Sequence, residues 1–372
     1  MTGFIPVNKP LLNGNEQRYL LECIETGWIS SEGPFVGRFE DEFAARMGKA
    51  HGISVSNGSV AIDVAVAALG LKPDDEVILP TFTIISCIAP LIRAGVKPVL
   101  VDADSATWTM NPDQVRAKVG ERTKAIMVVH TYGLPVDMDP ILDIAREHDL
   151  AIIEDAAEAH GSLYRGRPCG SFGTISTFSF YANKHVTTGE GGMVLTDDAA
   201  LAERAKSLRN LCFKPEKRFV HDELGSNFRF TNIQAAIGLA QLERLDETLI
   251  RKRALGARYR RALEGLNGLQ LPADDVGYAQ NDYWVFGVVL DDDIAMDAVE
   301  VAKALAAKGI GTRPFFWCMH EQPIFEKSGL FAAETYPVAE RLARRGLYLP
   351  SGIGTTDDEI DASAAALVEV LR

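Results

Sequence analysis

The sequence has few cysteines, no excess of basic residues and no long apolar run. Its five cysteines (positions 23, 87, 169, 212 and 318) form no Cys-x-x-Cys pair, which favours a reducing cytoplasm and argues against structural zinc. The formal charge of -13 argues against nucleic-acid binding, because phosphate backbones are held by basic residues. No apolar run approaches the ~20 residues that span a bilayer, and no basic-then-apolar leader opens the chain, so we expect neither export nor membrane insertion.

The length and the order of apolar runs indicate two α/β domains. A chain of 372 residues exceeds what one hydrophobic core usually serves. Between residues 50 and 200, short apolar runs alternate with segments of helical periodicity, which predicts a mostly parallel sheet with helices on both faces. Helix start signals and interleaved charged residues over 231–263 predict one long helix. It leads to a smaller C-terminal α/β domain. We place the boundary at residue 245, so the large domain covers 1–245 and the smaller one 246–372.

One lysine stands out between the apolar run at 177–180 and the turn GEGG at 189–192. A lysine such as Lys184, if held in a cleft, can lose its proton, because burial and nearby cations disfavour the ammonium form. The free amine can then form a Schiff base with a carbonyl cofactor, so pyridoxal phosphate is the first hypothesis. Taken alone, a lysine beside a glycine turn is more often solvated than catalytic.

Two other segments supply what that cofactor needs. Its ring nitrogen requires a carboxylate, and Asp155 ends the buried run 151–155, where ligands sit in open α/β sheets. A strand-end aspartate that caps a turn is the alternative. Gly58 and Ser59 begin an apolar helix, whose N-terminus is an anion site unless it is merely capped. Ser179 either adds a hydroxyl to the same phosphate or simply alternates within a strand.

Together these segments resemble the DegT/DnrJ/EryC1/StrS nucleotide-sugar aminotransferases, which are fold type I pyridoxal-phosphate enzymes. The resemblance covers nearly the whole chain through SNGS at 56–59, LPTFT at 79–83, EDAAEAHG at 154–161, FSFYANKHVTTGEGG at 178–192 and GSNFRFTNIQAAIGLAQL at 225–242. A finer resemblance, carried also by RNLCFKPEKRFVH at 209–221, is to enzymes that use glutamate to aminate C4 of GDP-4-keto-6-deoxymannose.

Carried over by position, the resemblance implies a role for each matching residue. Lys184 would hold the cofactor as an imine and move protons, and Asp155 would pair with the ring nitrogen. Three residues would hold the phosphate: Gly58, Ser59 and Ser179. Asn227 would reach the phosphate bound to the neighbouring subunit of a homodimer with shared sites. No histidine lies at metal-ligand spacing from a cysteine, so we expect no metal.

Two positions depart from the common family pattern. Glu158 stands where many relatives have a glutamine near the cofactor's phenolic oxygen, and two acids there would repel unless one is protonated. An aromatic residue usually stacks on the ring close to Thr83, so here either Phe82 stacks or Ile84 covers the face by apolar contact. Lysine at 184, where the family's dehydratases have histidine, favours an aminotransferase.

A sugar diphosphate needs cationic partners even in an acidic protein. The candidates are Lys9, Arg229 and Arg313. A basic run at 214–221 is as readily a solvated loop as a contact. Asn8 and Trp28 lie in segments that line the sugar site in similar enzymes, although Trp28 is as readily a core residue. Two alternatives stay open: a UDP- or dTDP-linked 3- or 4-ketosugar as substrate, or a regulatory protein that binds the cofactor without turnover.

Overall fold

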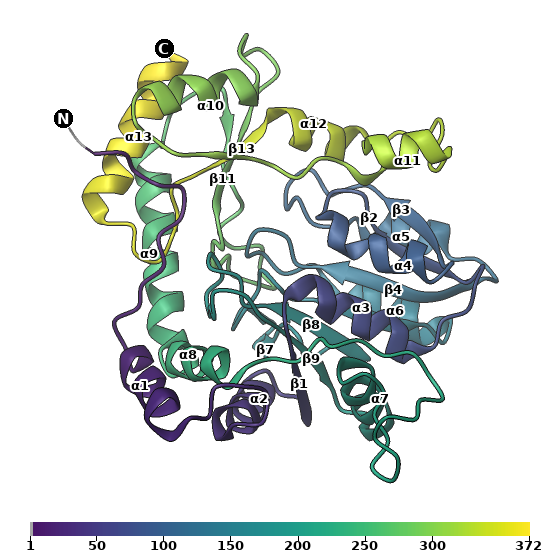
Figure 1. Ribbon diagram of the computed structural model, residues 1–372. Coiled ribbons are helices and arrows are strands. Elements are labelled where there is room, and N and C mark those ends of the chain that lie inside the picture. Colours follow the sequence, from purple (N-terminus) through teal and green to yellow (C-terminus); the bar gives the residue numbers. More distant parts are fainter. Residues whose placement is uncertain (1–2) are drawn as a thin grey trace.

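The computed structural model describes residues 3–372, whose elements alternate through the first half of the chain (Figure 1). The strands are β1 (His51–Val55), β2 (Glu76–Pro80), β3 (Lys97–Val101), β4 (Thr123–Val129), β5 (Ala151–Asp155), β6 (Leu163–Tyr164), β7 (Arg167–Pro168), β8 (Ile175–Ser179), β9 (Gly192–Thr196), β10 (Leu269–Gln270), β11 (Phe286–Leu290), β12 (Arg313–Pro314) and β13 (Gly346–Leu349). The helices are α1 (Glu16–Thr26), α2 (Pro34–Arg46), α3 (Gly58–Leu69), α4 (Ala89–Arg93), α5 (Pro112–Lys118), α6 (Met138–Glu147), α7 (Ala199–Arg209), α8 (Asn232–Leu242), α9 (Leu245–Ala262), α10 (Ala298–Ala307), α11 (Pro323–Ser328), α12 (Pro337–Arg345) and α13 (Asp357–Leu371), with the 3-10 turns η1 (Ile85–Cys87) and η2 (Met319–Glu321).

A seven-stranded sheet forms the centre of the structure, in the order β1-β9-β8-β5-β4-β2-β3. The five strands from β8 to β3 pair in parallel, and β9 is antiparallel to both of its neighbours. The predicted mostly parallel α/β sheet is therefore confirmed. Because the parallel strands share one direction, their carboxyl ends meet at one edge of the sheet, where ligands bind in open α/β folds.

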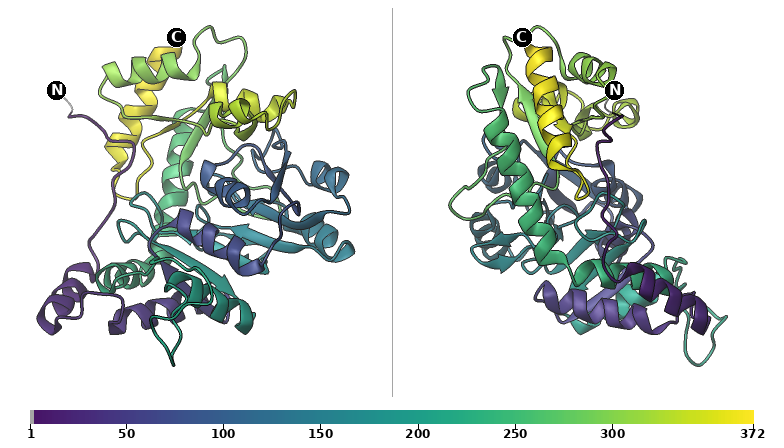
Figure 2. Two further views of the ribbon diagram at one scale, coloured as in Figure 1. Left: turned by 45° about the vertical axis from the view of Figure 1, so that its right-hand side comes forward. Right: turned by 90° about the vertical axis from the view of Figure 1, so that its left-hand side faces the viewer.

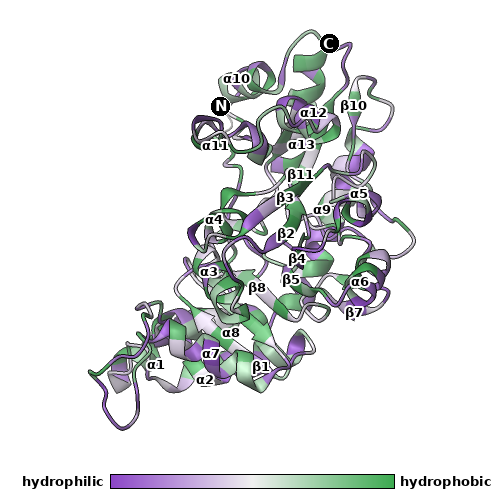
Figure 3. Cartoon of the chain, turned by 90° about the vertical axis from the view of Figure 1, so that its right-hand side faces the viewer, coloured by the Kyte–Doolittle hydropathy of each residue, from purple (hydrophilic) through white to green (hydrophobic). Residues whose placement is uncertain are grey.

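The strands are buried on both faces. Along β4, Ala125, Met127 and Val129 belong to one apolar cluster, which includes α3. Their neighbours Ile126 and Val128 belong to another, which includes α6. This alternation explains why such strands read as continuous apolar runs in the sequence. Figure 3 shows hydrophobic residues gathered around β5 and β8, at the middle of the sheet.

The predicted single helix over 231–263 is two helices. Thr231 caps α8 with a reciprocal capping box to Gln234, as the sequence suggests. The chain then breaks between α8 and α9, at Glu243 and Arg244. Glu243 there accepts hydrogen bonds from Asn15 and from the hydroxyl of α1 residue Tyr19. The break lets α8 pack on α1 and α2, while α9 runs toward the C-terminal elements (Figure 1).

A second, four-stranded sheet of order β10-β11-β13-β12 is antiparallel. Its apolar cluster contains residues of α9, α10 and α13, and the right-hand view of Figure 2 shows α9 and α13 side by side. The N-terminal segment also joins this region, since Ile5 pairs with Ile310 and Ser351 N–H donates to the Val7 carbonyl. The domain boundary at residue 245 stays a prediction, although α9 begins there.

Within residues 3–372, no helix has both the length and the apolar character needed to cross a membrane.

Candidate active site

A cavity of about 690 Å³ opens at the carboxyl edge of the large sheet. Segments that follow β2, β4, β5 and β8 meet there, because these strands run in parallel. The start of α3 forms one wall, and residues from the C-terminal part of the chain form another. The predicted residues that line this cavity are Gly58, Ser59, Asp155, Glu158, Ser179 and Lys184.

The start of α3 forms one end of the cavity. The side chain of Asn57, the N-cap residue, accepts a hydrogen bond from the Val60 N–H at 3.0 Å. A Cβ atom on Gly58 would lie only 2.5 Å from the Cβ of Ser179, so a glycine is required for this close approach. The unpaired N–H groups and the positive dipole of α3 therefore adjoin the Ser179 hydroxyl, an arrangement that suits a phosphate group.

Asp155 ends β5 and is buried at the cavity. Its Oδ1 accepts from the Ala157 N–H at 3.0 Å, and its Oδ2 accepts from the Cys87 thiol at 3.3 Å. Burial raises the pKa of Asp155, and these two hydrogen bonds act in the opposite direction. Each carboxylate oxygen has two lone pairs, so Asp155 keeps acceptor capacity for a donor in the cavity.

Lys184 lies between a carboxylate and an aromatic ring. Its Nζ is 3.6 Å from Glu158 Oε1 and 3.7 Å from the centroid of the Trp284 ring. Burial lowers the pKa of Lys184, although Glu158 and Asp155 act against that shift. Burial likewise raises the pKa of Glu158 to about 7, while its Oε2 accepts from the Tyr132 N–H. The cavity thus favours the uncharged forms of both groups, as a lysine nucleophile requires.

The structure does not place Phe82 at the cavity. Its ring is buried against Tyr132, Phe315 and Phe316, with centroid distances of 5.8 to 6.2 Å. Ile84, two residues after Phe82, is 44% exposed and lines the cavity. Of the two candidates, Ile84 therefore lies at the cavity, and Phe82 lies in the aromatic cluster behind it.

The predicted substrate residues lie in three kinds of place: an adjoining cavity, the exposed surface and a separate hollow. Asn8 and Arg313 line an adjoining cavity of about 400 Å³, which shares Trp284 and Tyr348 with the first. Lys9 is exposed, 3.8 Å from a Glu359 oxygen. Trp28 is 49% exposed and so is not a core residue.

Two further predicted residues, Arg229 and Asn227, also lie away from the Lys184 cavity. Arg229 lines a separate hollow of about 660 Å³ together with Lys214 and Arg218, and it donates to Asn210 Oδ1 at 2.8 Å. Asn227 is exposed and pairs through its backbone with Asn210. Neither residue lines the cavity of its own chain.

Several residues that shape the cavity were not predicted from the sequence. Tyr132 holds a positive φ of 59°, and a Cβ atom on the following Gly133 would lie only 2.4 Å from the backbone nitrogen of Trp284. Trp284 Nε1 in turn donates to the carbonyl of Asn183, beside Lys184. These contacts join segments that are far apart in the chain, and no local pattern marks them.

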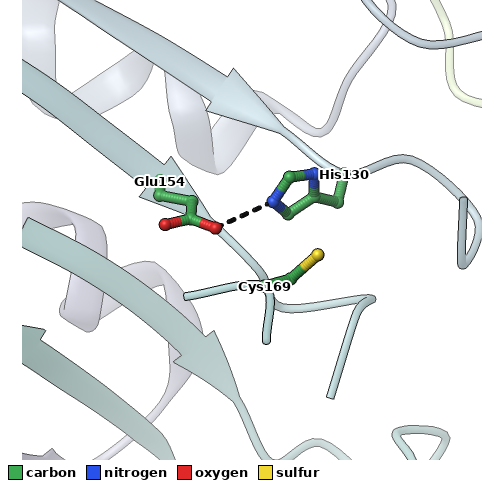
Figure 4. Close-up of side chains that lie close together, drawn as sticks. All are labelled: His130, Glu154 and Cys169. Atoms are coloured by element: carbon green, nitrogen blue, oxygen red, sulfur yellow. Dashed lines mark hydrogen bonds and ion pairs between the residues drawn. The ribbon is translucent and has the colours of Figure 1, made fainter. Parts of the chain in front are cut away.

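Beside the cavity, which His130 lines, the residues His130, Glu154 and Cys169 form a buried cluster (Figure 4). His130 Nδ1 accepts from the Val136 N–H, so Nε2 is the nitrogen that donates to Glu154, at 3.0 Å. Glu154 also accepts three backbone N–H bonds from the turn at 170–173. Burial keeps the pKa of the Cys169 thiol well above its usual value. The lone pairs a metal would need are therefore engaged, and the cluster fastens this turn to β4 and β5.

A model of the DegT/DnrJ/EryC1/StrS aminotransferase family matches residues 10–368. The chain belongs to this family. GDP-perosamine synthase of Caulobacter vibrioides is 43% identical over 99% of this chain and 98% of its own, and the Escherichia coli O157:H7 enzyme of the same name is 40% identical over 96% of both. Among solved structures, S. venezuelae DesV superposes with a TM-score of 0.88 at 33% identity, over 96% of this chain and 95% of its own.

This family member is a pyridoxal-phosphate-dependent nucleotide-sugar aminotransferase with the fold of the type I enzymes. Its cavity suits that cofactor on three counts. The N-terminus of α3, where Gly58 closely approaches Ser179, suits an anion. Asp155 is a buried carboxylate with acceptor capacity left, and Lys184 is a buried lysine with a lowered pKa.

Replacing Glu158 by glutamine should change how the stability of the cofactor-free protein depends on pH. Because the folded-state pKa of Glu158 is raised from 4.5 to about 7, the folded protein binds more protons than the unfolded chain within this window. The free energy of unfolding contributed by Glu158 therefore falls as pH rises through the window. Glutamine does not titrate, so Glu158→Gln lacks this loss. The free energy of unfolding of Glu158→Gln minus that of wild type, both measured with urea, should therefore increase between pH 5 and 7.

The exposed Glu326→Gln substitution is the matched control and should leave the pH profile unchanged. A Glu158→Gln profile parallel to that of wild type would show that Glu158 titrates as an ordinary carboxyl.

Proposed function

We propose that this enzyme transfers the amino group of L-glutamate to C4 of GDP-4-keto-6-deoxy-D-mannose. The product would be GDP-perosamine, for O-antigen or another amino-sugar glycan. The observation that carries the proposal is the full-length identity of 40 to 43% with two relatives that bear the name GDP-perosamine synthase. The cysteines of the described chain are all buried and free, which supports a reducing cytoplasm as the site of action.

Four groups are proposed to hold the cofactor. Lys184 is its covalent anchor, and Asp155 pairs with the ring nitrogen. The start of α3, with Gly58 and Ser59, and the Ser179 hydroxyl hold the phosphate. Their common position at one cavity supports this assignment. When bound, pyridoxal phosphate supplies an electron sink that makes the carbon bearing the amino group acidic.

The chain itself supplies the base for proton transfer. Lys184 Nζ is the amine that takes a proton from one carbon and returns it to another, because burial lowers its pKa and so favours the free amine. Glu158, 3.6 Å away, holds or releases a proton near physiological pH, since its own pKa is about 7. The Trp284 ring beneath Nζ limits where the amine can move.

The active unit is proposed to be a homodimer in which each site is completed by the partner. Asn227 and Arg229 lie outside the cavity of their own chain, beside a hollow with three other basic residues. Exposed apolar side chains also cluster in and after α1, at Leu21, Ile24, Trp28 and Ile29. Apolar groups gathered in this way are typical of subunit interfaces.

The substrate proposal is tested by giving the enzyme glutamate and separate GDP-, UDP- and dTDP-linked 4-keto-6-deoxyhexoses. We expect the GDP-mannose derivative to yield a 4-amino sugar with the highest kcat/KM, because binding the correct nucleotide and sugar epimer positions the keto carbon. Mass spectrometry and NMR of the products identify the aminated carbon. Preferred amination of a UDP or dTDP sugar would contradict the substrate but leave the aminotransferase assignment intact.

Shared sites predict complementation between two impaired variants, Lys184→Ala and Asn227→Ala. In a mixed dimer, the Lys184 of one chain meets the Asn227 of the other, so one of the two sites is intact. Random 1:1 assembly should therefore restore roughly a quarter of wild-type activity. Mixing Lys184→Ala with the Lys184→Ala/Asn227→Ala double variant is the control, since it leaves no intact site. Recovery no greater than this control would exclude the cross-subunit role of Asn227.

A further inference from the structure

A buried cysteine contacts the carboxylate at the cavity. Cys87, the last residue of η1, has no exposed surface. Its Sγ lies 3.3 Å from Asp155 Oδ2 and 3.2 Å from the Thr83 hydroxyl oxygen. The ionised carboxylate has no hydrogen to give, so the thiol donates to Asp155 and the Thr83 hydroxyl donates to the sulfur. Three residues, two from the segment after β2 and one from the end of β5, thus form one chain of hydrogen bonds across the intervening strand β4.

The geometry leaves Asp155 with one donor on each oxygen. The Ala157 N–H belongs to the same turn and holds Oδ1 at 3.0 Å. Among the side chains of residues 3–372, the Cys87 thiol is the one that donates a hydrogen bond to Oδ2. Together the two bonds fix the rotation of the carboxylate plane. A carboxylate held by the Ala157 N–H alone would be free to turn its second oxygen.

Cys87 suits this task because it stays protonated. Burial, and then the nearby Asp155 charge, raise the pKa of the Cys87 thiol well above its usual value. The thiol therefore adds no second negative charge beside the carboxylate. Being inaccessible and protonated, it is also a poor nucleophile, which argues against a redox or covalent role.

We propose that Cys87 is a positioning residue for the cofactor: its thiol orients Asp155 so that the carboxylate faces the ring nitrogen. This inference rests on the proposed role of Asp155. Through the same hydrogen bond, Cys87 favours the ionised form of Asp155, which a protonated ring nitrogen requires. The dependence is indirect, because Cys87 does not line the cavity itself.

Other ionisable groups face Asp155 and belong to the same electrostatic balance. A proton on Lys184 or on His130 favours the ionised form of Asp155, and an ionised Glu158 opposes it. His130 is already engaged with Glu154 and does not compete for Asp155 oxygens. A substitution at Cys87 leaves these three groups in place, so a change in Asp155 ionisation can be assigned to the lost donor.

The test compares Cys87→Thr with Cys87→Val in the full-length protein. The two side chains have nearly the same shape, but only threonine keeps a hydrogen-bond donor. The measurement is the Kd of pyridoxal phosphate for the cofactor-stripped protein, from its absorbance between pH 5.5 and 8. We expect Cys87→Val to bind about tenfold more weakly than Cys87→Thr, because a hydrogen bond to a charged group is lost. As the pH is lowered, cofactor binding should also begin to weaken at a higher pH in Cys87→Val than in Cys87→Thr.

Cys318→Val controls for the general cost of altering a buried cysteine, since Cys318 belongs to the same apolar cluster as Cys87. It should bind the cofactor like wild type. Equal binding by Cys87→Val and Cys87→Thr, or an equal loss in Cys318→Val, would overturn the role of Cys87. Asp155→Ala tests the role of Asp155 separately from the role of Cys87. If Asp155→Ala binds the cofactor as tightly as wild type, the assignment of Asp155 itself fails.

Discussion

Burial of charge at one edge of a parallel sheet is the constraint on which this active site depends. Lys184, Asp155 and Glu158 share a cavity and are each more than nine-tenths buried, and removing an ion from water costs several kcal/mol unless it is paired. Burial raises the pKa of both carboxyl groups, that of Glu158 to about 7, and lowers the pKa of Lys184. Relative to water, the cavity therefore favours the uncharged form of each group.

The remainder of the fold holds these groups in place. The five parallel strands bring four loops to one edge, and the His130–Glu154 pair fastens the turn at 170–173 beneath them. From the other side, the C-terminal part contributes Trp284 under Lys184, and Lys252 ties that segment down by donating to the Trp284 carbonyl. Two close approaches, at Gly58 and Gly133, leave no room for a side chain.

Much of this site can be predicted from the sequence, because Asp155, Ser179 and Lys184 lie at the ends of apolar runs whose direction fixes where they meet. The helix break after Leu242 could not be predicted, since charged residues with good helix propensity continue through it and tertiary contacts to α1 decide it. The sequence could not decide whether Phe82 or Ile84 lies at the cavity, because this depends on the conformation of the turn that follows β2. Cys87 and Trp284 carry no local signal, because their partners are 68 and 101 residues away.

The covalent role of Lys184 is the claim on which the functional account depends, and the chain contains a natural competitor for it. Lys252 is also buried, with its pKa lowered to about 7, but it donates to the backbone carbonyls of Trp284 and Ser351 and does not line the cavity. Reduction of the cofactor-loaded enzyme with borohydride, followed by proteolysis and mass spectrometry, distinguishes the two. We expect the mass of the reduced cofactor on Lys184. A label on Lys252, or no labelled peptide, would contradict the account.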